Sequence, residues 1–270
     1  MPSFDAELNT NVCDRYNNAD LTITLKIQLK PVDPDGGKAR GEHHDYGDAT
    51  EPKRKTIKWT NASWVAWKSR FIRSAQRYWH GKFWLANNFN CLTYEDRGTE
   101  YRPNLYCRFR LLEADSVASA HETIEVVRLH RSEKWMGSHS TLFNSLDIEN
   151  YAALSDSKGN KIYQRAHVHE VGHLLGLGHV DEGKAHCPAS NTNASACYGV
   201  ADEDMYSVMG SGMQLRTEFA NPWRRAAVRL TRKGSAGTMS DWKASMKRIY
   251  PRNHWEILSN AKITRRPSRK

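Results

Sequence analysis

The sequence lacks the features of a chain built into a membrane or routed by a signal peptide. None of its apolar runs approaches the roughly 20 consecutive residues that a membrane-spanning helix requires. The first residues, Met1 to Glu7, have neither the basic start nor the apolar segment of a signal peptide. Internal repeats are also absent. The length of 270 residues fits one fairly large domain, or a domain with an elaborated C-terminal part.

The sequence also lacks zinc-finger, helix-turn-helix and RNA-binding motifs. Its net charge of +10 therefore does not by itself predict a nucleic-acid partner. The basic residues are scattered, with denser patches at Lys53-Arg54-Lys55, at Arg224-Arg225 and in the tail. We interpret the charge as a solvated surface, with acidic surfaces, anionic polymers and membranes as alternative partners. The basic tail, residues 263–270, is expected to be disordered.

The cysteines are few and form no C-x-x-C pair, so they predict no second metal site. The five are Cys13, Cys91, Cys107, Cys187 and Cys197. Cys187 and Cys197 flank a polar loop that a disulfide would fasten, and Cys91 and Cys107 form a second possible pair, which would leave Cys13 over. Buried or free thiols in a reducing compartment are the alternative.

Hydrophobic patterns predict one clear strand and one clear helix in the first third of the chain. Residues 21–29 alternate strictly between apolar and polar side chains, which is typical of a half-buried strand. Residues 31–58 are polar and predict an exposed loop. A helix capped by Thr60 or Asn61 and closed by Gly81 follows, and its aromatic stripe predicts packing against a sheet.

Further strands are expected at residues 83–86, 105–112, 123–129 and 141–148. The segment from Asn160 or Lys161 predicts a second helix, followed by a polar loop over residues 180–204. Asn221-Pro222-Trp223 opens a third helix, which runs to about Leu230. A last helix is predicted from Ser240 or Asp241 to Pro251, with Trp242, Met246 and Ile249 on one stripe.

The most informative stretch is residues 169–179, H-E-V-G-H-L-L-G-L-G-H. On a helix, His169 and His173 present two imidazoles to one point, because residues four apart lie on one face. Gly176 occupies the place of a left-handed C-terminal cap, and Gly178 is a second permissive position. The chain can therefore turn and bring His179 to the same ion.

Three neutral imidazoles leave one position of a tetrahedral zinc ion open, which is the arrangement of a catalytic site. Glu170 is not needed as a ligand and can act as the general base for a water molecule activated by Zn²⁺. An ordinary histidine-rich amphipathic helix is the alternative. Four carboxylates near the motif are candidates to orient the histidines. They are Asp181, Glu182, Asp202 and Asp204.

Two other histidine positions are weaker candidates. His167 precedes His169 by two residues and lies on a different helical face, so we expect it to be a supporting or surface residue. His43, His44 and Asp45 are of a type that binds metals, but an exposed polar loop explains them better.

The pattern at residues 169–179 resembles the zinc helix of the metzincin metallopeptidases, whose second hallmark is a methionine turn. Ser207-Val208-Met209-Gly210 resembles that turn, and Met209 would lie beneath the zinc ion. Met205 and Met213 lack the Ser-x-Met context. Some metzincins carry a tyrosine two residues after the turn methionine, whereas this chain has Ser211 there.

The resemblance implies an α+β fold of the zincin type. It consists of a twisted mixed five-stranded sheet, a backing helix, the active-site helix and a small, mostly helical C-terminal subdomain. The N-terminal subdomain would cover residues 1–180 and the C-terminal subdomain residues 181–262. The strand at 123–129 or the one at 141–148 would pair with the substrate backbone.

The expected function is therefore that of a zinc-dependent metalloendopeptidase acting on proteins or peptides. A zinc amidase acting on a non-protein amide, such as cell-wall peptide stems, and a non-catalytic zinc-binding module are the alternatives. A cleaving enzyme without a signal peptide suggests a secreted toxin or effector with its own export route, and the cytoplasm is the alternative location. An inhibitor or immunity protein is a further possible partner.

Overall fold

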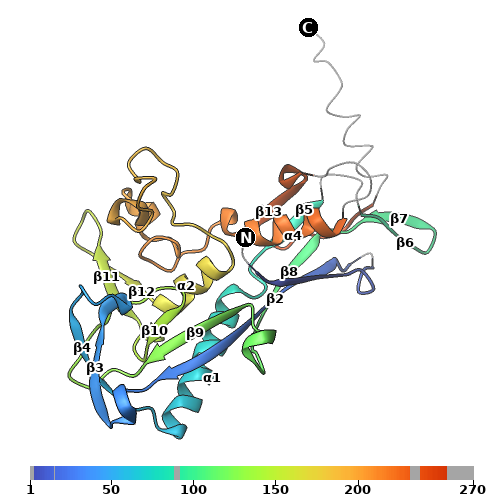
Figure 1. The fold of residues 1–270 in the computed structure, drawn as a ribbon. Helices are drawn as coiled ribbons and strands as arrows, with labels where there is room; N and C mark the ends of the chain where they lie inside the picture. The colour runs from blue at the N-terminus through green and yellow to red at the C-terminus, as the bar shows by residue number, and fades with distance from the viewer. Residues whose placement is uncertain (1–2, 15, 88–91, 232–237, 254–270) are drawn as a thin grey trace. The chain divides into compact units, whose positions relative to one another are not determined.

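The computed structural model describes residues 3–14, 16–87, 92–231 and 238–253, which belong to two compact units (Figure 1). The first unit comprises Met1–Phe4, Thr24–Tyr78 and Arg110–Leu215, and the second comprises Asp5–Ile23, Trp79–Phe109 and Arg216–Lys270. The predicted subdomain boundary at residue 180 lies inside the first unit, whose last segment continues to Leu215. The predicted tail, residues 263–270, lies outside the described residues.

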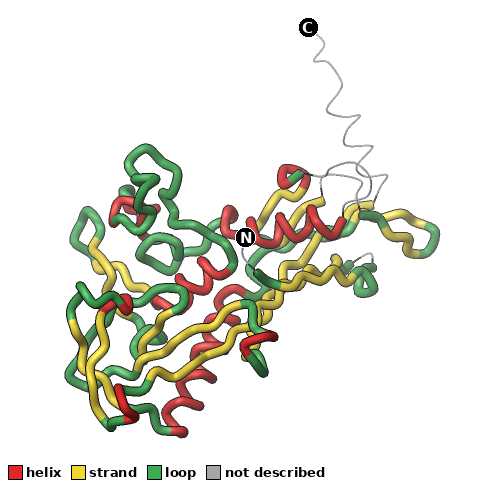
Figure 2. The backbone as a smooth tube through the Cα atoms, in the orientation of Figure 1, coloured by secondary structure: helices red, strands yellow, loops and turns green. Residues whose placement is uncertain are grey.

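The fold is a mixture of strands and few helices, in agreement with the predicted α+β class (Figure 2). The elements within the first unit are β3 (Arg40–His44), β4 (Lys53–Ile57), β9 (Glu122–Val127), β10 (Leu142–Asn144), β11 (Tyr151–Ser155), β12 (Lys161–Gln164), α2 (Ala166–Leu174) and α3 (Asp202–Met205). Those within the second are β1 (Asp5–Asn9), β5 (Trp84–Asn87), β6 (Tyr94–Asp96), β7 (Thr99–Arg102), α4 (Asn221–Thr231), β13 (Trp242–Ser245) and β14 (Arg252–Asn253). Three elements cross a unit boundary: β2 (Ala19–Val32), α1 (Asn61–Trp79) and β8 (Leu105–Glu113).

Over the described residues the main sheet is mixed and has seven strands, so the predicted number of five is wrong. In the first unit the order is β10-β9-β2-β8, and β9 pairs in parallel with both β2 and β10. In the second unit β5 lies between β8 and β13 and is antiparallel to both, while β1 pairs with β2. The additional strands are short or polar segments that lack a clear alternation of apolar residues.

Helix α1 covers one face of the sheet in the first unit, as its aromatic stripe predicts (Figure 1). Its start is capped by Thr60, whose Oγ1 accepts from the Ser63 N–H at 3.2 Å. Phe71 is fully buried and packs edge-on against Phe143 of β10, with ring centroids 5.2 Å apart. Ile27 of β2 and Val126 of β9 are also fully buried.

The predicted start of the second helix, at Asn160 or Lys161, is wrong because residues 151–164 form the β11–β12 hairpin. The Asp156 carboxylate accepts from the N–H groups of Lys158 and Asn160 at 2.9 and 2.7 Å, which closes a tight turn. Ile162 and Gln164 are buried while Lys161 and Tyr163 are exposed, as strand alternation requires. The helix begins only at Ala166.

Two further sequence-based expectations are wrong. Residues 31–58 are not a loop throughout, because β3 and β4 form an antiparallel hairpin whose mostly polar, solvent-facing residues hide its strand character. The last predicted helix is strand β13, paired with β5. Trp242 is fully buried, but Met246 is 44% exposed, so the supposed apolar stripe does not exist. The helix predicted at Asn221 is confirmed as α4.

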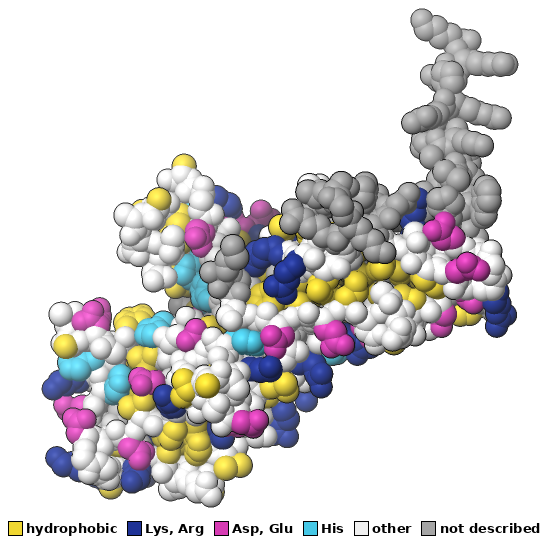
Figure 3. Space-filling view, turned by 45° about the vertical axis from the view of Figure 1, so that its right-hand side comes forward, with side chains coloured by type: hydrophobic (Ala, Val, Ile, Leu, Met, Phe, Trp, Pro, Cys, Tyr) yellow, Lys and Arg dark blue, Asp and Glu magenta, His cyan; other side chains and the backbone are white. Residues whose placement is uncertain are grey.

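Long loops occupy most of the chain between α2 and α4, interrupted only by short helical segments (Figure 2). On the face shown in Figure 3, lysine and arginine side chains are dispersed among acidic ones instead of forming one continuous patch. Among the described residues, none of the helices combines the length and apolar character needed to span a membrane.

Candidate metal centre

Helix α2 places His169 and His173 one turn apart, and their Nε2 atoms lie 3.0 Å from each other. The helix ends as the sequence predicts, with Gly176 in the left-handed region at φ +80°. The Leu177 N–H bonds to the Gly172 carbonyl and the Gly176 N–H to that of His173, at 3.0 and 2.8 Å. These are the two hydrogen bonds of a Schellman cap.

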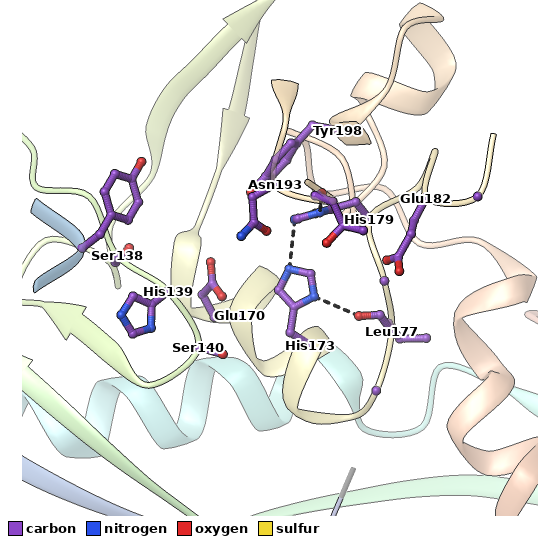
Figure 4. Close-up of a pocket in the computed structure, with 15 residues that line it drawn as sticks. Ser138, His139, Ser140, Glu170, His173, Leu177, His179, Glu182, Asn193 and Tyr198 are labelled. Atoms are coloured by element: carbon purple, nitrogen blue, oxygen red, sulfur yellow. Dashed lines mark hydrogen bonds between the residues drawn. The ribbon is translucent and has the colours of Figure 1, made fainter. Parts of the chain in front are cut away.

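Beyond this cap the chain turns back and delivers His179 to the same point (Figure 4). The His179 Nε2 lies 3.1 Å from that of His173. A Cβ at Gly178 would meet the carboxylate of Glu182, an exposed and flexible side chain that can move aside. The turn therefore depends on the left-handed Gly176 and does not require glycine at position 178.

Each imidazole is oriented through its other nitrogen by a backbone carbonyl. The Nδ1 atoms of His169, His173 and His179 lie 2.8, 2.9 and 2.7 Å from the carbonyl oxygens of Val208, Leu177 and Thr192. A carbonyl oxygen only accepts, so each Nδ1 carries the proton and each neutral imidazole has its lone pair on Nε2. The three lone pairs point toward one another, and none of the Nε2 atoms carries a proton that could form a hydrogen bond between them.

This convergence is what a metal ion requires. In a tetrahedral site with metal–nitrogen bonds of about 2.0–2.1 Å, two ligand nitrogens are about 3.3 Å apart, close to the separations found here. Within the described part of the chain, His169, His173 and His179 are the one group of this kind, with all ligand atoms within 4.8 Å. The three histidines can therefore hold a metal ion.

Burial keeps the three histidines neutral. It lowers the pKa of His173 to about 4, with a smaller contribution from the charge of His179. It also lowers the pKa of His179, and that of His169 falls well below its ordinary value through burial and its two neighbours. Protons therefore do not compete with a cation for these nitrogens near neutral pH.

Glu170 follows the first histidine and lines the cleft beside the cluster (Figure 4). Burial, and secondarily the charge of Asp147, raises the pKa of its carboxyl to about 8. Asp147 is buried, and its carboxylate accepts from the Asn144 N–H at 2.7 Å. Burial raises the pKa of Asp147 to about 7, and the sequence analysis did not single it out.

The cluster lies between two cavities, one of about 1160 Å³ and one of about 650 Å³. His173 and His179 line the first, and His169 lines the second. Residues that line both cavities are Tyr46, Ser138, Glu170, Asn193 and Tyr198. The three histidines and Glu170 therefore face open space and are not sealed in a closed core.

Tyr198 is the main site residue that the sequence analysis missed. Its ring lies 3.8 Å, centroid to centroid, from that of His179, and 5.7 Å from that of His169. Burial, followed by the charge of Glu170, raises its pKa. Tyr198 comes from a polar loop far along the chain from Glu170, and no local pattern marks it.

The Cys187–Cys197 disulfide closes the loop that precedes Tyr198 and contains Thr192, the acceptor for His179. One of the two predicted disulfides is therefore present. Cys13 and Cys107 are free thiols, so Cys107 does not form the other predicted pair. Cys91 lies outside the described residues.

The segment around Met209 supports the cluster through its backbone. The Val208 carbonyl accepts from His169, and the Met209 carbonyl accepts from the Val180 N–H at 3.0 Å, next to His179. The Met209 side chain is fully buried. Met213 is used elsewhere, since its sulfur accepts from the Arg165 N–H. Met205 lies at the end of α3.

The carboxylates that were candidates to orient the histidines have other partners or positions. Asp181 accepts from His186 and from the Val200 N–H, at 2.8 and 3.0 Å, and pairs with Lys184. Asp202 accepts from Ser157, Asp204 pairs with Lys184, and Glu182 lines the larger cavity. Backbone carbonyls perform the orienting role instead.

The remaining candidate histidines lie outside the cluster. His167 is buried and bonds through Nδ1 to the Asp147 carbonyl oxygen at 2.9 Å, so it is a supporting residue and not a surface one. His43 and His44 bond to backbone carbonyls, and Asp45 is buried in an ion pair with Arg54.

Comparison of the chain with protein-family models, with curated proteins and with solved structures gives no match.

Proposed function

We propose that the protein is a zinc-dependent metalloendopeptidase of the metzincin type. The observation that carries the proposal is the convergence of three neutral Nε2 atoms beside Glu170, in a cleft open on two sides. Three imidazoles with an open fourth position are the usual donor set of a catalytic zinc ion. The H-E-x-x-H-x-x-G-x-x-H pattern and the Ser-x-Met segment add support.

The three histidines would hold the ion through Nε2, with Nδ1 of each fixed by a carbonyl. When bound, zinc supplies Lewis acidity, which makes a water molecule more acidic and polarises a carbonyl group. Glu170 removes the proton from the attacking water and then delivers it to the amine nitrogen as the C–N bond breaks. The pKa of about 8 belongs to the metal-free site, where burial favours the neutral acid. A bound Zn²⁺ would favour the ionised carboxylate, which is the form that takes the proton.

Tyr198 is our candidate for the group that stabilises the transition state. Ser211 occupies the position at which some metzincins carry a tyrosine, so the methionine turn of this chain supplies no tyrosine that could stabilise the transition state. The Tyr198 ring packs against His179, and Tyr198 lines both cavities. Besides burial, the charge of Glu170 contributes to the raised pKa of its hydroxyl group. Its raised pKa keeps the phenol protonated, so that it can donate to a developing oxyanion.

The proposed substrate is an extended peptide that crosses the centre from one cavity to the other. The predicted strands for pairing with it are poorly placed. β9 lies inside the sheet, and the outward groups of β10 are already bonded, Leu142 to His139 and the Asn144 N–H to Asp147. Tyr151–Leu154 of β11 line the smaller cavity, so we place the substrate backbone along β11.

A closed structural zinc site fits less well, because such sites carry four protein ligands. Among the described residues, the metal group contains three. The Cys187–Cys197 disulfide supports an oxidising compartment, and hence export from the cell, as part of the proposal.

The test is cleavage of a peptide library, read by mass spectrometry, with the metal content of the same sample measured by elemental analysis. We expect cleavage that stops when a chelator removes the metal and returns when Zn²⁺ is added back in stoichiometric amount. Cleavage that persists in fully demetallated protein contradicts the proposal, as does a metal-loaded protein that cleaves no peptide.

A further inference from the structure

A third cavity in the first unit is lined by arginine. Its volume is about 290 Å³, and the residues that line it are Arg70, Arg73, Ser74, Arg77, Ile148 and Arg165. It shares no lining residue with the two cavities at the metal centre. This arginine cavity is therefore a separate feature of the surface.

Three of the arginines come from one face of α1. Arg70, Arg73 and Arg77 are spaced three and four residues apart, which places them in a row along the helix. Arg165 joins them from the segment between β12 and α2. The four are not consecutive in the sequence, which is why no basic run reveals them.

The positive charge of the cavity is poorly balanced. Arg70 pairs with Glu149 at 2.7 Å, and the Arg73 Nε donates to the Ser69 carbonyl at 3.1 Å. Within the part of the chain that the structure describes, no carboxylate pairs with Arg73, Arg77 or Arg165. Four guanidinium groups thus face one carboxylate.

Arg165 is half-buried, whereas the three arginines of α1 are exposed. The Arg165 Nε is buried, and no acceptor among the described residues reaches it. A buried donor without a partner is costly, and four neighbouring positive charges repel one another. That nitrogen is out of reach of solvent, so an anion in the cavity would bind to the accessible guanidinium nitrogens of the four arginines and reduce their repulsion.

We propose that the arginine cavity binds the phosphate group of a small ligand. Guanidinium groups form forked, charge-assisted hydrogen bonds to phosphate oxygens, and arginines arriving from two elements suit a tetrahedral anion. A cavity of 290 Å³ is just below the range of about 300–1000 Å³ typical of small-molecule pockets. It therefore fits a compact ligand better than a polymer.

The cavity is connected to the segment that carries the metal-binding histidines. Ser74 lines the cavity, and its Oγ is bonded to the His167 Nε2. Arg165 immediately precedes α2, and its N–H bonds to the Met213 sulfur at 3.4 Å. A bound phosphate would thus link the arginines of α1 to Arg165 at the start of α2, and binding to the folded state alone would stabilise the protein.

The test is titration of the full chain with inorganic phosphate by calorimetry, together with thermal unfolding in phosphate and in chloride at equal ionic strength. We expect saturable binding of one phosphate and a higher Tm in phosphate. Arg73→Gln and Arg165→Gln should each weaken binding about tenfold or more, because each removes a charged hydrogen bond. Arg73 is exposed, so its variant should fold even where Arg165→Gln does not.

The matched control is Arg131→Gln, which removes an exposed arginine outside the cavity. It should bind phosphate as the parent does. Equal weakening in all three variants means general charge attraction and overturns the proposal, as does the absence of saturable binding. A further outcome is that inorganic phosphate does not bind, whereas a single-stranded oligonucleotide binds and Arg73→Gln weakens that binding. This result overturns the proposal of a small ligand and assigns the arginines to a nucleic acid.

Discussion

The Nδ1 of His169 donates to the Val208 carbonyl oxygen at 2.8 Å, which joins the first histidine of the cluster to the residue before Met209. This bond fixes the tautomer and the ring orientation of His169 from a segment 39 residues further along the chain. Groups that orient metal ligands in this way commonly change metal affinity about 10–100-fold when they are disturbed.

The first prediction concerns Met209, whose buried side chain holds this segment in place. Met209→Ala leaves a cavity and should lower the free energy of unfolding by about 2–5 kcal/mol. Because Val208 can then shift, zinc affinity should fall as well, about tenfold. Met209→Leu conserves volume and should cost less than about 1.5 kcal/mol. Urea unfolding and competition with a zinc chelator measure both quantities, and an alanine variant with unchanged zinc affinity contradicts this role.

The second prediction concerns the Cys187–Cys197 disulfide. Replacing both cysteines by serine should reduce stability by roughly 2–3 kcal/mol, because the unfolded chain gains conformational freedom. The loop also carries the Thr192 carbonyl that orients His179, so zinc should dissociate faster. Stopped-flow chelation measures that rate. Cys13→Ser, which removes a free thiol, is the control and should match the parent.

The third prediction concerns Tyr198. Tyr198→Phe keeps the ring against His179 but removes the hydroxyl group. Loss of one oxyanion donor typically lowers kcat about 10²–10³-fold, and we expect a decrease of at least about 10²-fold with normal zinc content. Steady-state kinetics on a library-derived peptide measures it. An unchanged kcat assigns Tyr198 to packing alone.

The fourth prediction is the pH dependence of stability in the metal-free protein. Burial lowers the pKa of His167 to about 3 and that of His173 to about 4, against 6.5 for an ordinary histidine. Below about pH 6.5 the unfolded chain binds protons that the folded chain does not. Their contribution to stability is therefore complete above that pH and is lost as the pH falls toward 4 and below.

Two carboxyl groups act in the opposite direction. The raised pKa values of Glu170 and Asp147, about 8 and 7, let the folded chain bind protons that the unfolded chain releases. Their contribution is present at lower pH and is lost as the pH rises through 7 to 8. The histidines with lowered pKa values, His167, His169, His173 and His179 among them, outnumber these two carboxyl groups between about pH 4 and 6.5, and above that range only the carboxyl groups change. Stability should therefore peak near pH 6.5 and fall as the pH rises through 7 to 8, which a series of urea unfolding curves can measure. A steady rise in stability from pH 7 to pH 5 contradicts the burial of neutral histidines.

The convergence of the three histidines could be predicted from sequence because their geometry is local. Helical spacing places His169 and His173, and Gly176 provides the turn that returns His179. The carbonyl groups of Val208, Leu177 and Thr192 could not be predicted, since every residue has such a group and only the tertiary fold selects these. Tyr198 was missed for the same reason.

The errors in the fold have physical causes. The strand at residues 161–164 is too short to show a clear alternation, and the helical pattern that follows it hides its start. The prediction of the last helix relies on the spacing of Trp242, Met246 and Ile249, which matches one face of a helix. Isolated hydrophobic spacing does not determine which residues find a buried environment. Strong alternation, as in residues 21–29, does predict its strand, because five apolar side chains share one face.

We propose that Glu170 moves protons beside a metal ion held by three histidines. The most direct test is Glu170→Gln, which keeps the size of the side chain and all three imidazoles but removes the base. Zinc content and peptide hydrolysis are measured on the same sample. We expect one zinc per chain and a loss of kcat of about 10²–10⁴-fold, the usual contribution of a positioned base. A variant that retains zinc and cleaves peptides as fast as the parent contradicts this proposal.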